Sequence, residues 1–286
     1  MHSVSMNEAR AANPQMVSAP VMDEASFATL AKLVKGQTGI VLSDRKRDLV
    51  QGRLARRLRA LGLPDYGAYC ALLQSPEGER ELGPMINAMT TNVTRFFREP
   101  HHFDMLRGEV IPACLEAGGT RFRLWSAGCS TGEEPYSIAM TLAAASRGAS
   151  WDARILATDI DSDVLARAAA GRYEAQAADA IPAEYRRRYV GRVDDEQIEI
   201  HPDLRPMLTF KQLNLMHGWP MRGPFDAIFC RNVVIYFDKE TQCDIFGRFA
   251  DLLSPGGWLF IGHSETLHGV SHRFAVAGRT AYRKRG

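Results

Sequence analysis

Residues 123–140 read RLWSAGCSTGEEPYSIAM, a strand-like apolar run followed by two glycines, small polar residues and two adjacent acids. A short apolar run that passes through a glycine-bearing turn into a helical segment is typical of a doubly wound α/β sheet. In such a sheet the ligand lies outside the carboxyl ends of the strands, beside this first turn. Gly128 and Gly132 would allow a ligand to approach the backbone closely. The stretch therefore predicts both a fold and the place of its site.

Strand-like and helix-like segments alternate through the rest of the C-terminal two thirds of the chain. The apolar runs are RFRLWSA, ARILATDI, FDAIFCRN and GWLFIGH, and amphipathic segments lie between them. Strands that alternate with helices predict a mostly parallel sheet with helices on both faces. Residues 183–211 break this rhythm with a helical start and short alternating pieces, so we expect a small β insertion there.

The first hundred residues have a helical period instead. Apolar residues recur at helical spacing in two segments, Phe27, Leu30, Leu33 and Val34 in the first and Leu49, Leu54, Leu58 and Leu61 in the second. Gly39 and Gly62 are the expected ends of these helices, and Ser43 is a candidate N-cap of the second. Helical patterns also cover residues 65–74 and 79–89. A small all-helical domain is therefore expected before the α/β domain.

The composition of the 286 residues is that of a globular chain, with 45% hydrophobic and 24% charged residues and a net charge of +2. This balance gives no whole-chain field that would hold nucleic acid or an anionic membrane. The five cysteines form no C-x-x-C pair, and the adjacent His101 and His102 lack metal-ligand spacing, so neither a disulfide framework nor a metal site is expected. No run has the length and apolar character of a signal peptide or a membrane span. We expect a cytoplasmic protein with a mobile tail over residues 1–22.

The charges beside the first turn limit the ligand. Glu133 and Glu134 stand at the expected start of a helix, where two acids would repel a phosphate. Asp159 ends the next strand, where an acid commonly accepts hydrogen bonds from ribose hydroxyls. A nucleoside with a positive centre and no phosphate describes S-adenosylmethionine. Alternatively, Gly128 and Gly132 are ordinary turn residues and Asp159 is the N-cap of the following helix.

The sequence LLSPGGWLFIGHSE, at residues 252–265, contains the Leu-x-Pro-Gly-Gly-x-Leu turn that precedes a late strand in many class I methyltransferases. The first turn departs from the acid-x-Gly-x-Gly-x-Gly pattern of that class. Ser126 stands where an acid is common, and Ser130 replaces the middle glycine.

Several blocks of sequence, taken in order, resemble one family. They are NAMTTNVTRFFREPHHF, WSAGCSTGEEPYSIA, ATDID, FDAIFCRNVVIYFD and PGGWLFIGHSE. They look like the bacterial chemotaxis receptor glutamate methyltransferases of the CheR type, and the resemblance covers about residues 25–284. It implies a class I methyltransferase fold with S-adenosyl-L-methionine as cofactor and S-adenosyl-L-homocysteine as product. It also implies methyl transfer to glutamate carboxylates of chemoreceptors, which forms methyl esters for sensory adaptation.

The resemblance further implies a domain organisation. Residues 23–90 would be a helical domain that recognises the substrate, and residues 91–103 a linker that contributes to the active site. Residues 104–286 would form the S-adenosylmethionine-dependent methyltransferase domain.

Individual residues match positions that carry roles in the family. Those expected to bind the cofactor are Asn92, Thr94, Arg98, Gly128, Glu134, Asp159, Asn214, Leu215, Arg231 and Asn232. Arg98 and Tyr236 are the expected catalytic residues. Glu134 would lie near the amino-acid part of the cofactor, Asp159 at the ribose, and residues 214–215 beside the adenine.

The implied reaction needs few groups. A glutamate side chain, with a pKa of about 4.3, is already a carboxylate at neutral pH, so no general base is required. Because carboxylate attack on a sulfonium methyl removes both charges, the enzyme must mainly align and desolvate the reactants. Arg98 could guide the carboxylate in, and Tyr236 could orient it. Alternatively, Arg98 forms a surface ion pair with Glu99, and Tyr236 is a core aromatic residue.

Substrate capture is expected on the predicted helix over residues 44–59, which carries seven basic and two acidic residues. The basic residues largely off the leucine stripe are Arg45, Lys46, Arg53, Arg56 and Arg57. Beside a glutamate-methylating domain, these residues suit an acidic receptor coiled coil by electrostatic complementarity. The alternative is an ordinary solvated helix face.

The insertion bears on how a receptor would be reached. Some family members hold a receptor C-terminal peptide as an added strand on a small β-subdomain, beside a glycine-bearing loop. Here the loop at residues 191–197, GRVDDEQ, has one glycine and three acids, which would repel a terminal carboxylate. We therefore expect a monomer that binds the cytoplasmic helices of chemoreceptors without a tether peptide, nucleic acid or membrane insertion, recruited to receptor arrays. The alternative is that Arg186, Arg187, Arg188 and Arg192 supply a peptide site.

Two alternative functions would be expected to leave different features in the sequence. Methyltransferases that act on amides or exocyclic amines of nucleic acid usually carry an Asn/Asp-Pro-Pro-Tyr turn after the fourth strand, where this chain reads RNVVIYF. A catalytically silent docking module would not need Arg98, Glu134, Asp159 and Tyr236 together. Both observations favour the glutamate methyltransferase.

Overall fold

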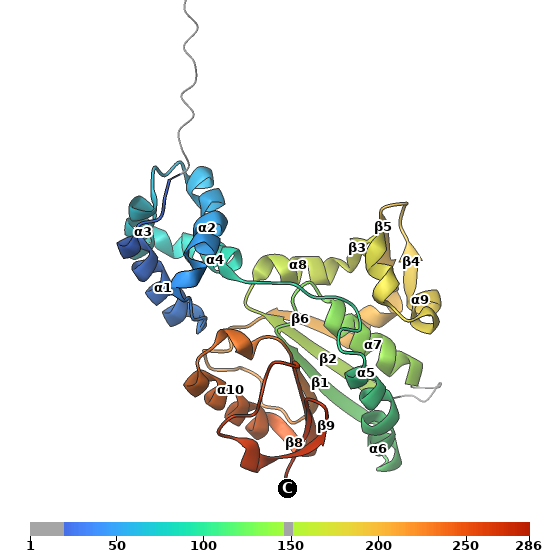
Figure 1. Cartoon of the computed structure of the whole chain (residues 1–286). Helices are drawn as coiled ribbons and strands as arrows, with labels where there is room; N and C mark the ends of the chain where they lie inside the picture. Colours follow the sequence, from blue (N-terminus) through green and yellow to red (C-terminus); the bar gives the residue numbers. More distant parts are fainter. Residues whose placement is uncertain (1–19, 146–150) are drawn as a thin grey trace, which may run out of the picture.

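The computed structural model describes residues 20–145 and 151–286. It contains a small helical part and a larger α/β part, joined by a segment that crosses the top of the sheet (Figure 1). Most of the expected tail, residues 1–22, lies outside the described residues. The last residue of that range, Met22, is buried in the helical core, and its N–H donates to Gln51 at 2.8 Å.

The helical part contains α1 (Glu24–Thr38), η1 (Asp44–Lys46), α2 (Arg47–Leu61), α3 (Tyr66–Gln74), η2 (Pro76–Gly78) and α4 (Glu79–Met89). Gly39 ends α1 and Gly62 ends α2, each in the left-handed conformation that glycine adopts at little cost. Ser43 precedes the short η1 turn rather than capping α2 directly. Leu49 was predicted in the apolar stripe but is 48% exposed, and Val50 is buried in its place. Leu49 instead lines a cavity between the two parts.

The large sheet has seven strands in the order β6-β2-β1-β7-β8-β10-β9. The strands are β1 (Arg121–Ala127), β2 (Asp152–Asp159), β6 (Leu208–Gln212), β7 (Phe225–Cys230), β8 (Leu253–Ile261), β9 (Phe274–Gly278) and β10 (Ala281–Lys284). The first five in this order pair in parallel, whereas β10 is antiparallel to both β8 and β9. This mostly parallel sheet, preceded by helices, confirms the predicted fold class.

Helices cover both faces of the large sheet. They are α5 (His101–Met105), the π-helical η3 (Leu106–Val110), α6 (Ile111–Glu116), α7 (Glu133–Ala145), α8 (Ser162–Ala170) and α10 (Lys239–Leu252). Because successive strand residues point to opposite faces, neighbours belong to different cores. Leu124 and Phe229 join the core under α5 and α7, while Trp125 and Ile228 join the core under α10. Within the described residues, no helix is long and apolar enough to cross a membrane.

The small insertion is a separate three-stranded sheet in the order β3-β5-β4. It contains β3 (Arg172–Glu174), η4 (Ala175–Ala180), α9 (Ala183–Tyr189), β4 (Val190–Arg192) and β5 (Gln197–Ile200), with η5 (Pro202–Met207) leading back. The predicted bounds, residues 183–211, were therefore wrong at both ends. β3 already belongs to the small sheet, and β6 pairs in parallel with β2 in the large one.

The helical part is fixed against the carboxyl ends of the large sheet. Val41 N–H donates to the carbonyl of Tyr236 at 2.9 Å, and the Asn214 amide donates to the carbonyl of Gln37 at 2.6 Å. These bonds place the turn η6 (Val234–Tyr236) directly below the loop between α1 and α2. A cavity lies between the two parts at this edge of the sheet.

Candidate active site

The cavity is bounded by the helical part, by the segment after α4 and by the ends of β1, β2 and β7. All the predicted cofactor-binding and catalytic residues line it: Asn92, Thr94, Arg98, Gly128, Glu134, Asp159, Asn214, Leu215, Arg231, Asn232 and Tyr236. Lys46 and Arg53 of the predicted substrate helix also line it. The fold thus gathers into one place residues that lie more than a hundred positions apart.

The first turn after β1 explains why Gly128 is a glycine and why a serine can stand in the middle-glycine position. Gly128 has φ +83°, and a Cβ there would meet a methyl group of Val233 at 2.3 Å, so only glycine fits. Ser130, in the middle-glycine position, has φ +50°. Its N–H donates to Asp159 at 2.8 Å and its hydroxyl donates to the carbonyl of Asn92 at 2.9 Å. The serine therefore joins the turn to the crossing segment, which a glycine could not do.

Gly132 has a packing role rather than a ligand role. It is buried with φ +99°, and a Cβ there would lie 2.8 Å from both the Cβ of Ala168 and the hydroxyl of Tyr173. It does not line the cavity in the described structure.

Glu134 is a largely buried carboxylate at the start of α7. It accepts a hydrogen bond from the Ser126 hydroxyl at 2.7 Å, so the serine stands in contact with the acid instead of replacing it. Arg231 Nε lies 3.7 Å from its other oxygen. Burial raises the pKa of Glu134, and the positive charge of Arg231 opposes that rise.

Asp159 and Asp161, at the end of β2, have different roles. Asp159 lines the cavity and accepts N–H bonds from Ser130 and Asp161, and burial raises its pKa. Asp161 is the N-cap of α8. The alternative that Asp159 caps the helix is therefore wrong. Asp161 also accepts hydrogen bonds from Thr90 and from the Asn92 amide, at 2.7 and 2.8 Å.

The segment that carries Arg98 has an unusual backbone. Phe97 and Glu99, on either side of Arg98, have φ +49° and +56°, a region that non-glycine residues seldom adopt. The Arg98 guanidinium donates to the carbonyl of Val93 at 3.1 Å, and the carbonyl of Arg98 accepts a bond from Arg231. Such strain persists only where surrounding contacts fix it, and it is often found at functional sites.

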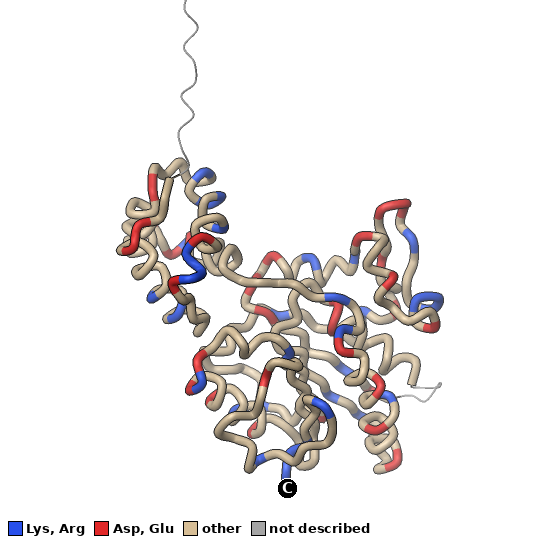
Figure 2. The backbone as a smooth tube through the Cα atoms, viewed as in Figure 1, with Lys and Arg blue, Asp and Glu red and all other residues tan. Residues whose placement is uncertain are grey.

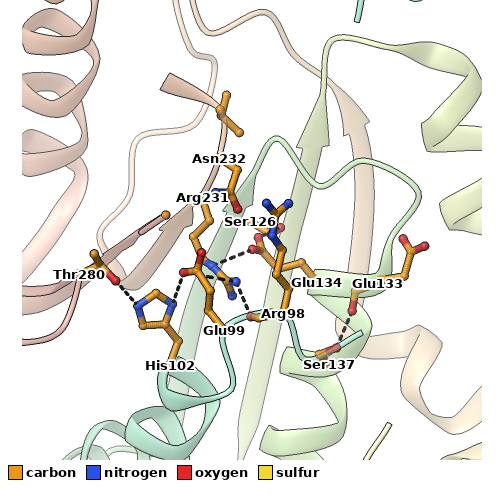
Figure 3. Close-up of polar contacts among 12 residues, drawn as sticks. Arg98, Glu99, His102, Ser126, Glu133, Glu134, Ser137, Arg231, Asn232 and Thr280 are labelled. Atoms are coloured by element: carbon orange, nitrogen blue, oxygen red, sulfur yellow. Dashed lines mark hydrogen bonds and ion pairs between the residues drawn. The ribbon is translucent and has the colours of Figure 1, made fainter. Parts of the chain in front are cut away.

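Glu99 does not pair with Arg98; it faces inward (Figure 3). One of its oxygens accepts from the His263 N–H at 3.2 Å and lies 2.9 Å from its Nδ1, and the other lies 3.7 Å from Arg231. Burial would raise the pKa of Glu99, but the His263 hydrogen bond and Arg231 lower it. Arg231, with 6% of its surface exposed, therefore lies between Glu99 and Glu134.

Glu99, His101 and His102 place potential metal-ligand atoms within 4.8 Å of one another, which the sequence spacing did not predict. The guanidinium of Arg231 is as close to Glu99 as His102 is, at 3.7 and 3.6 Å, and a cation there would be repelled. Burial lowers the pKa of His102 to about 3, so this histidine is neutral at physiological pH. We assign no metal to this group.

Glu265 is a site residue that the sequence analysis missed. It is 4% exposed and accepts backbone N–H bonds from Asn232, Val233, Val234 and Gly262. It thereby holds the turn that leads from β7 to Tyr236. The motif GHSE ends at this position, but only the glycine-containing turn before it was interpreted.

Lys and Arg are frequent along α2 (Figure 2), and the contacts of the basic side chains of η1 and α2 divide them into different classes. Arg57 forms a bidentate pair with the buried Glu81, at 2.8 and 2.7 Å. Arg53 donates to the carbonyls of residues 89 and 90 at 2.6 and 2.8 Å. Lys46 Nζ lies 5.9 Å above the ring of Tyr236, at the cavity. Arg45 and Arg56 are exposed. Arg53 and Arg57 therefore have partners within the protein, which the sequence analysis did not predict.

Asn214 and Leu215 also lie at the joint between the two parts. The Asn214 side chain accepts from Met216 N–H at 3.0 Å while its amide group donates to the end of α1. Leu215 is 8% exposed and presents an apolar side chain to the cavity. An apolar wall of this kind suits the face of a purine ring.

Comparison with known proteins agrees with this architecture. Residues 25–90 match the domain described as CheR methyltransferase, all-alpha domain, and residues 92–283 match CheR methyltransferase, SAM binding domain. The chain is 44% identical over 258 residues to a probable chemotaxis protein methyltransferase of Rhizobium etli, covering 88% of this chain and 96% of the relative. It is 43% identical over 272 residues to the chemotaxis protein methyltransferase of Salmonella typhimurium, covering 94% and 93% respectively.

Proposed function

The chain belongs to the CheR methyltransferase family, and from this premise we propose that it methylates side-chain carboxylates of glutamates in chemoreceptors. Its cofactor is S-adenosylmethionine, which supplies an electrophilic methyl group on a sulfonium centre. The glutamate specificity rests on the observation that Arg98, the cationic side chain of the strained segment, lines the cofactor cavity. A cation at that position suits a substrate that arrives as an anion.

The residues of the cavity fit the cofactor. Arg231 Nη1 and Asn232 Oδ1 are buried without hydrogen-bond partners in the described structure. An amino-acid group offers a carboxylate to the first and an ammonium to the second and to Glu134. Asp159 is the acid in reach of ribose hydroxyls at the end of β2. Acids at the start of α7 oppose the binding of a phosphate.

We assign the chemistry to positioning rather than to proton transfer. A substrate carboxylate is ionised at neutral pH and needs no base. Arg98 guides this carboxylate, and Tyr236, whose backbone carbonyl accepts a hydrogen bond from Val41 N–H, orients it. Removal of water from the cavity strengthens both contacts.

We propose a substrate surface that is narrower than the sequence analysis predicted. Because the guanidinium groups of Arg53 and Arg57 already have partners within the protein, the residues proposed to contact an acidic receptor helix are Arg45, Lys46 and Arg56. Exposed charges of this kind steer association and set specificity more than they add affinity.

We also propose that the small sheet does not hold a receptor tether. The charged side chains of the loop after β4 are exposed but have partners within the loop: Arg192 pairs with Asp195, and Asp194 accepts N–H bonds from residues 196 and 197. Titration with receptor C-terminal pentapeptides is expected to show no binding in the micromolar range. A micromolar complex would overturn this part of the proposal.

The direct test of the substrate is site mapping. A purified chemoreceptor cytoplasmic fragment is incubated with the enzyme and S-adenosylmethionine and then digested for mass spectrometry. Methyl groups are expected on glutamate side chains. Methylation of glutamine, lysine or backbone termini, without glutamate, would contradict the proposal.

A further inference from the structure

A second pocket adjoins the cofactor cavity on the outer side of the Arg98 segment. Val93, Thr94, Arg95 and Arg98 line both spaces. The other residues of the second pocket are Glu99, Pro100, His101, His263 and Arg279. Arg98 thus has the cofactor on one side and this pocket on the other.

The charge of the pocket is strongly positive. Three arginines line it against a single acid, Glu99, whose carboxylate is already engaged by His263 and Arg231. Arg95 and Arg279 are exposed, and neither side chain has a hydrogen-bond or ion-pair partner within residues 20–145 and 151–286. Two unpaired guanidinium groups at one pocket suit a carboxylate, which guanidinium can bind with two parallel hydrogen bonds.

The backbone at Arg279 is held by the buried His102. It lies at the tip of the hairpin between β9 and β10, where the next residue, Thr280, has φ +53°. The buried His102 holds this tip, since its Nε2 lies 2.9 Å from the Thr280 hydroxyl and 3.2 Å from the carbonyl of Arg279. The hairpin is therefore anchored to the helix that follows the Arg98 segment, and it presents its arginine at a defined place.

Val93 adds an apolar rim to this basic pocket. It is 81% exposed, although it lies in a short segment whose neighbours Phe96 and Phe97 are buried. An exposed valine beside unpaired arginines suits a protein surface that combines apolar and acidic side chains more than it suits a small anion.

We propose that this pocket is a subsite for a second acidic side chain of the protein substrate, bound beside the carboxylate that is methylated. Arg95 and Arg279 are the specificity residues of the subsite. This inference rests on the proposed function and gives its substrate class: acidic side chains in clusters rather than isolated ones.

The subsite has a consequence for successive reactions. A methyl ester is neutral, so a neighbour that has already been methylated loses its attraction to Arg95 and Arg279. Methylation of one acid in a cluster should therefore slow methylation of the next.

The test is a double-mutant cycle between enzyme and substrate. The enzymes are the unaltered chain, Arg95→Ala, Arg279→Ala and the control Arg222→Ala, an exposed arginine outside both pockets. The substrates are a chemoreceptor cytoplasmic fragment with a mapped methylation site and a variant in which the acids within one helical turn of that site are alanine. KM for the fragment, kcat and the cofactor Kd are measured for each pair.

With the clustered substrate, each pocket variant is expected to raise KM by about three- to fivefold, as for an exposed ion pair. For Arg279→Ala, whose side chain lies outside the cofactor cavity, kcat and the cofactor Kd should be unchanged. With the isolated acid, both variants and the unaltered enzyme should have the same raised KM. Equal effects on the two substrates, or no effect on either, would overturn the subsite while leaving the function intact. If the unaltered enzyme forms no glutamyl ester on any fragment, the proposed function fails, and the subsite with it.

Discussion

Arg231 Nε lies 3.7 Å from a carboxylate oxygen of Glu134, in a buried position between β7 and the start of α7. Glu99 approaches the same guanidinium from the other side, at 3.7 Å (Figure 3). One buried cation therefore links the cofactor cavity to the strained Arg98 segment. Arg231 also donates to the carbonyl of Arg98, the proposed catalytic arginine, so one side chain contacts both the cofactor cavity and the Arg98 segment.

Asp159→Ala is expected to weaken cofactor binding by about 1 to 3 kcal/mol, the usual loss for hydrogen bonds to a charged acceptor. Isothermal titration calorimetry with S-adenosylhomocysteine measures this. Asp159→Asn removes the negative charge but keeps an oxygen that can accept the Ser130 N–H bond. This variant therefore distinguishes the effect of the charge on cofactor binding from the effect of the hydrogen bond that supports the turn. Unchanged affinity in the alanine variant, with the fold intact, would remove Asp159 from the site.

Arg98→Ala and Tyr236→Phe are expected to lower kcat more than they lower cofactor affinity, because both residues are proposed to act on the incoming carboxylate. Steady-state kinetics and calorimetry together give the two quantities. An equal loss in both would make these residues cofactor ligands instead.

Glu265→Ala is expected to lower both the melting temperature and the affinity for cofactor. It would leave the N–H groups of Asn232, Val233 and Val234 buried without an acceptor, at about 1 to 3 kcal/mol for each unsatisfied group. Glu265→Gln keeps one acceptor oxygen, and its loss should be smaller. Thermal unfolding with and without cofactor checks both. A melting temperature equal to that of the unaltered chain would contradict the clamping role.

The free energy of unfolding should depend on pH through His102. Its pKa falls from 6.5 to about 3 on folding because the ring is buried. Between these pH values the unfolded chain therefore binds one more proton than the folded chain. The contribution of His102 to the free energy of unfolding is fully present above about pH 6.5 and is lost as the pH falls toward 3. One proton corresponds to about 1.4 kcal/mol per pH unit. In denaturant titrations from pH 7 to 5, His102→Gln should show a shallower slope; an identical slope would mean that His102 is not buried neutral.

Charge reversal should separate the two classes of basic residue in the helical part. Arg45→Glu and Arg56→Glu are expected to raise KM for a receptor fragment and to make activity less sensitive to salt, with little change in melting temperature. Arg57→Glu should instead unfold the helical part, because it would bury like charges beside Glu81. If Arg45→Glu and Arg56→Glu leave KM unchanged, the face formed by η1 and α2 is not the receptor surface.

The elements that could be predicted are those that depend on neighbours in sequence. β1 follows from the apolar run at residues 121–127, and the ends of α1 and α2 follow from Gly39 and Gly62. The candidate cofactor residues came from motifs, which mark positions without showing their contacts.

What could not be predicted depends on contacts between distant residues. Glu99 and Glu134 meet across Arg231, and Arg57 meets Glu81, only after the chain has folded. The place of β6 also depends on a distant partner. Its residues were predicted to belong to the insertion, but β6 pairs in parallel with β2 and so belongs to the large sheet. Glu265 was missed because a buried carboxylate that binds backbone N–H groups has no sequence pattern of its own.

The central claim is that the accepted methyl group becomes a glutamyl ester. The most direct measurement incubates the full chain with S-adenosylmethionine labelled in the methyl group and with chemoreceptor-containing membranes, and then treats the labelled protein with alkali. We predict label on a large membrane protein that alkali releases as methanol, and none with Arg98→Ala. Label that survives alkali, or no label from an enzyme that binds the cofactor, would contradict the account.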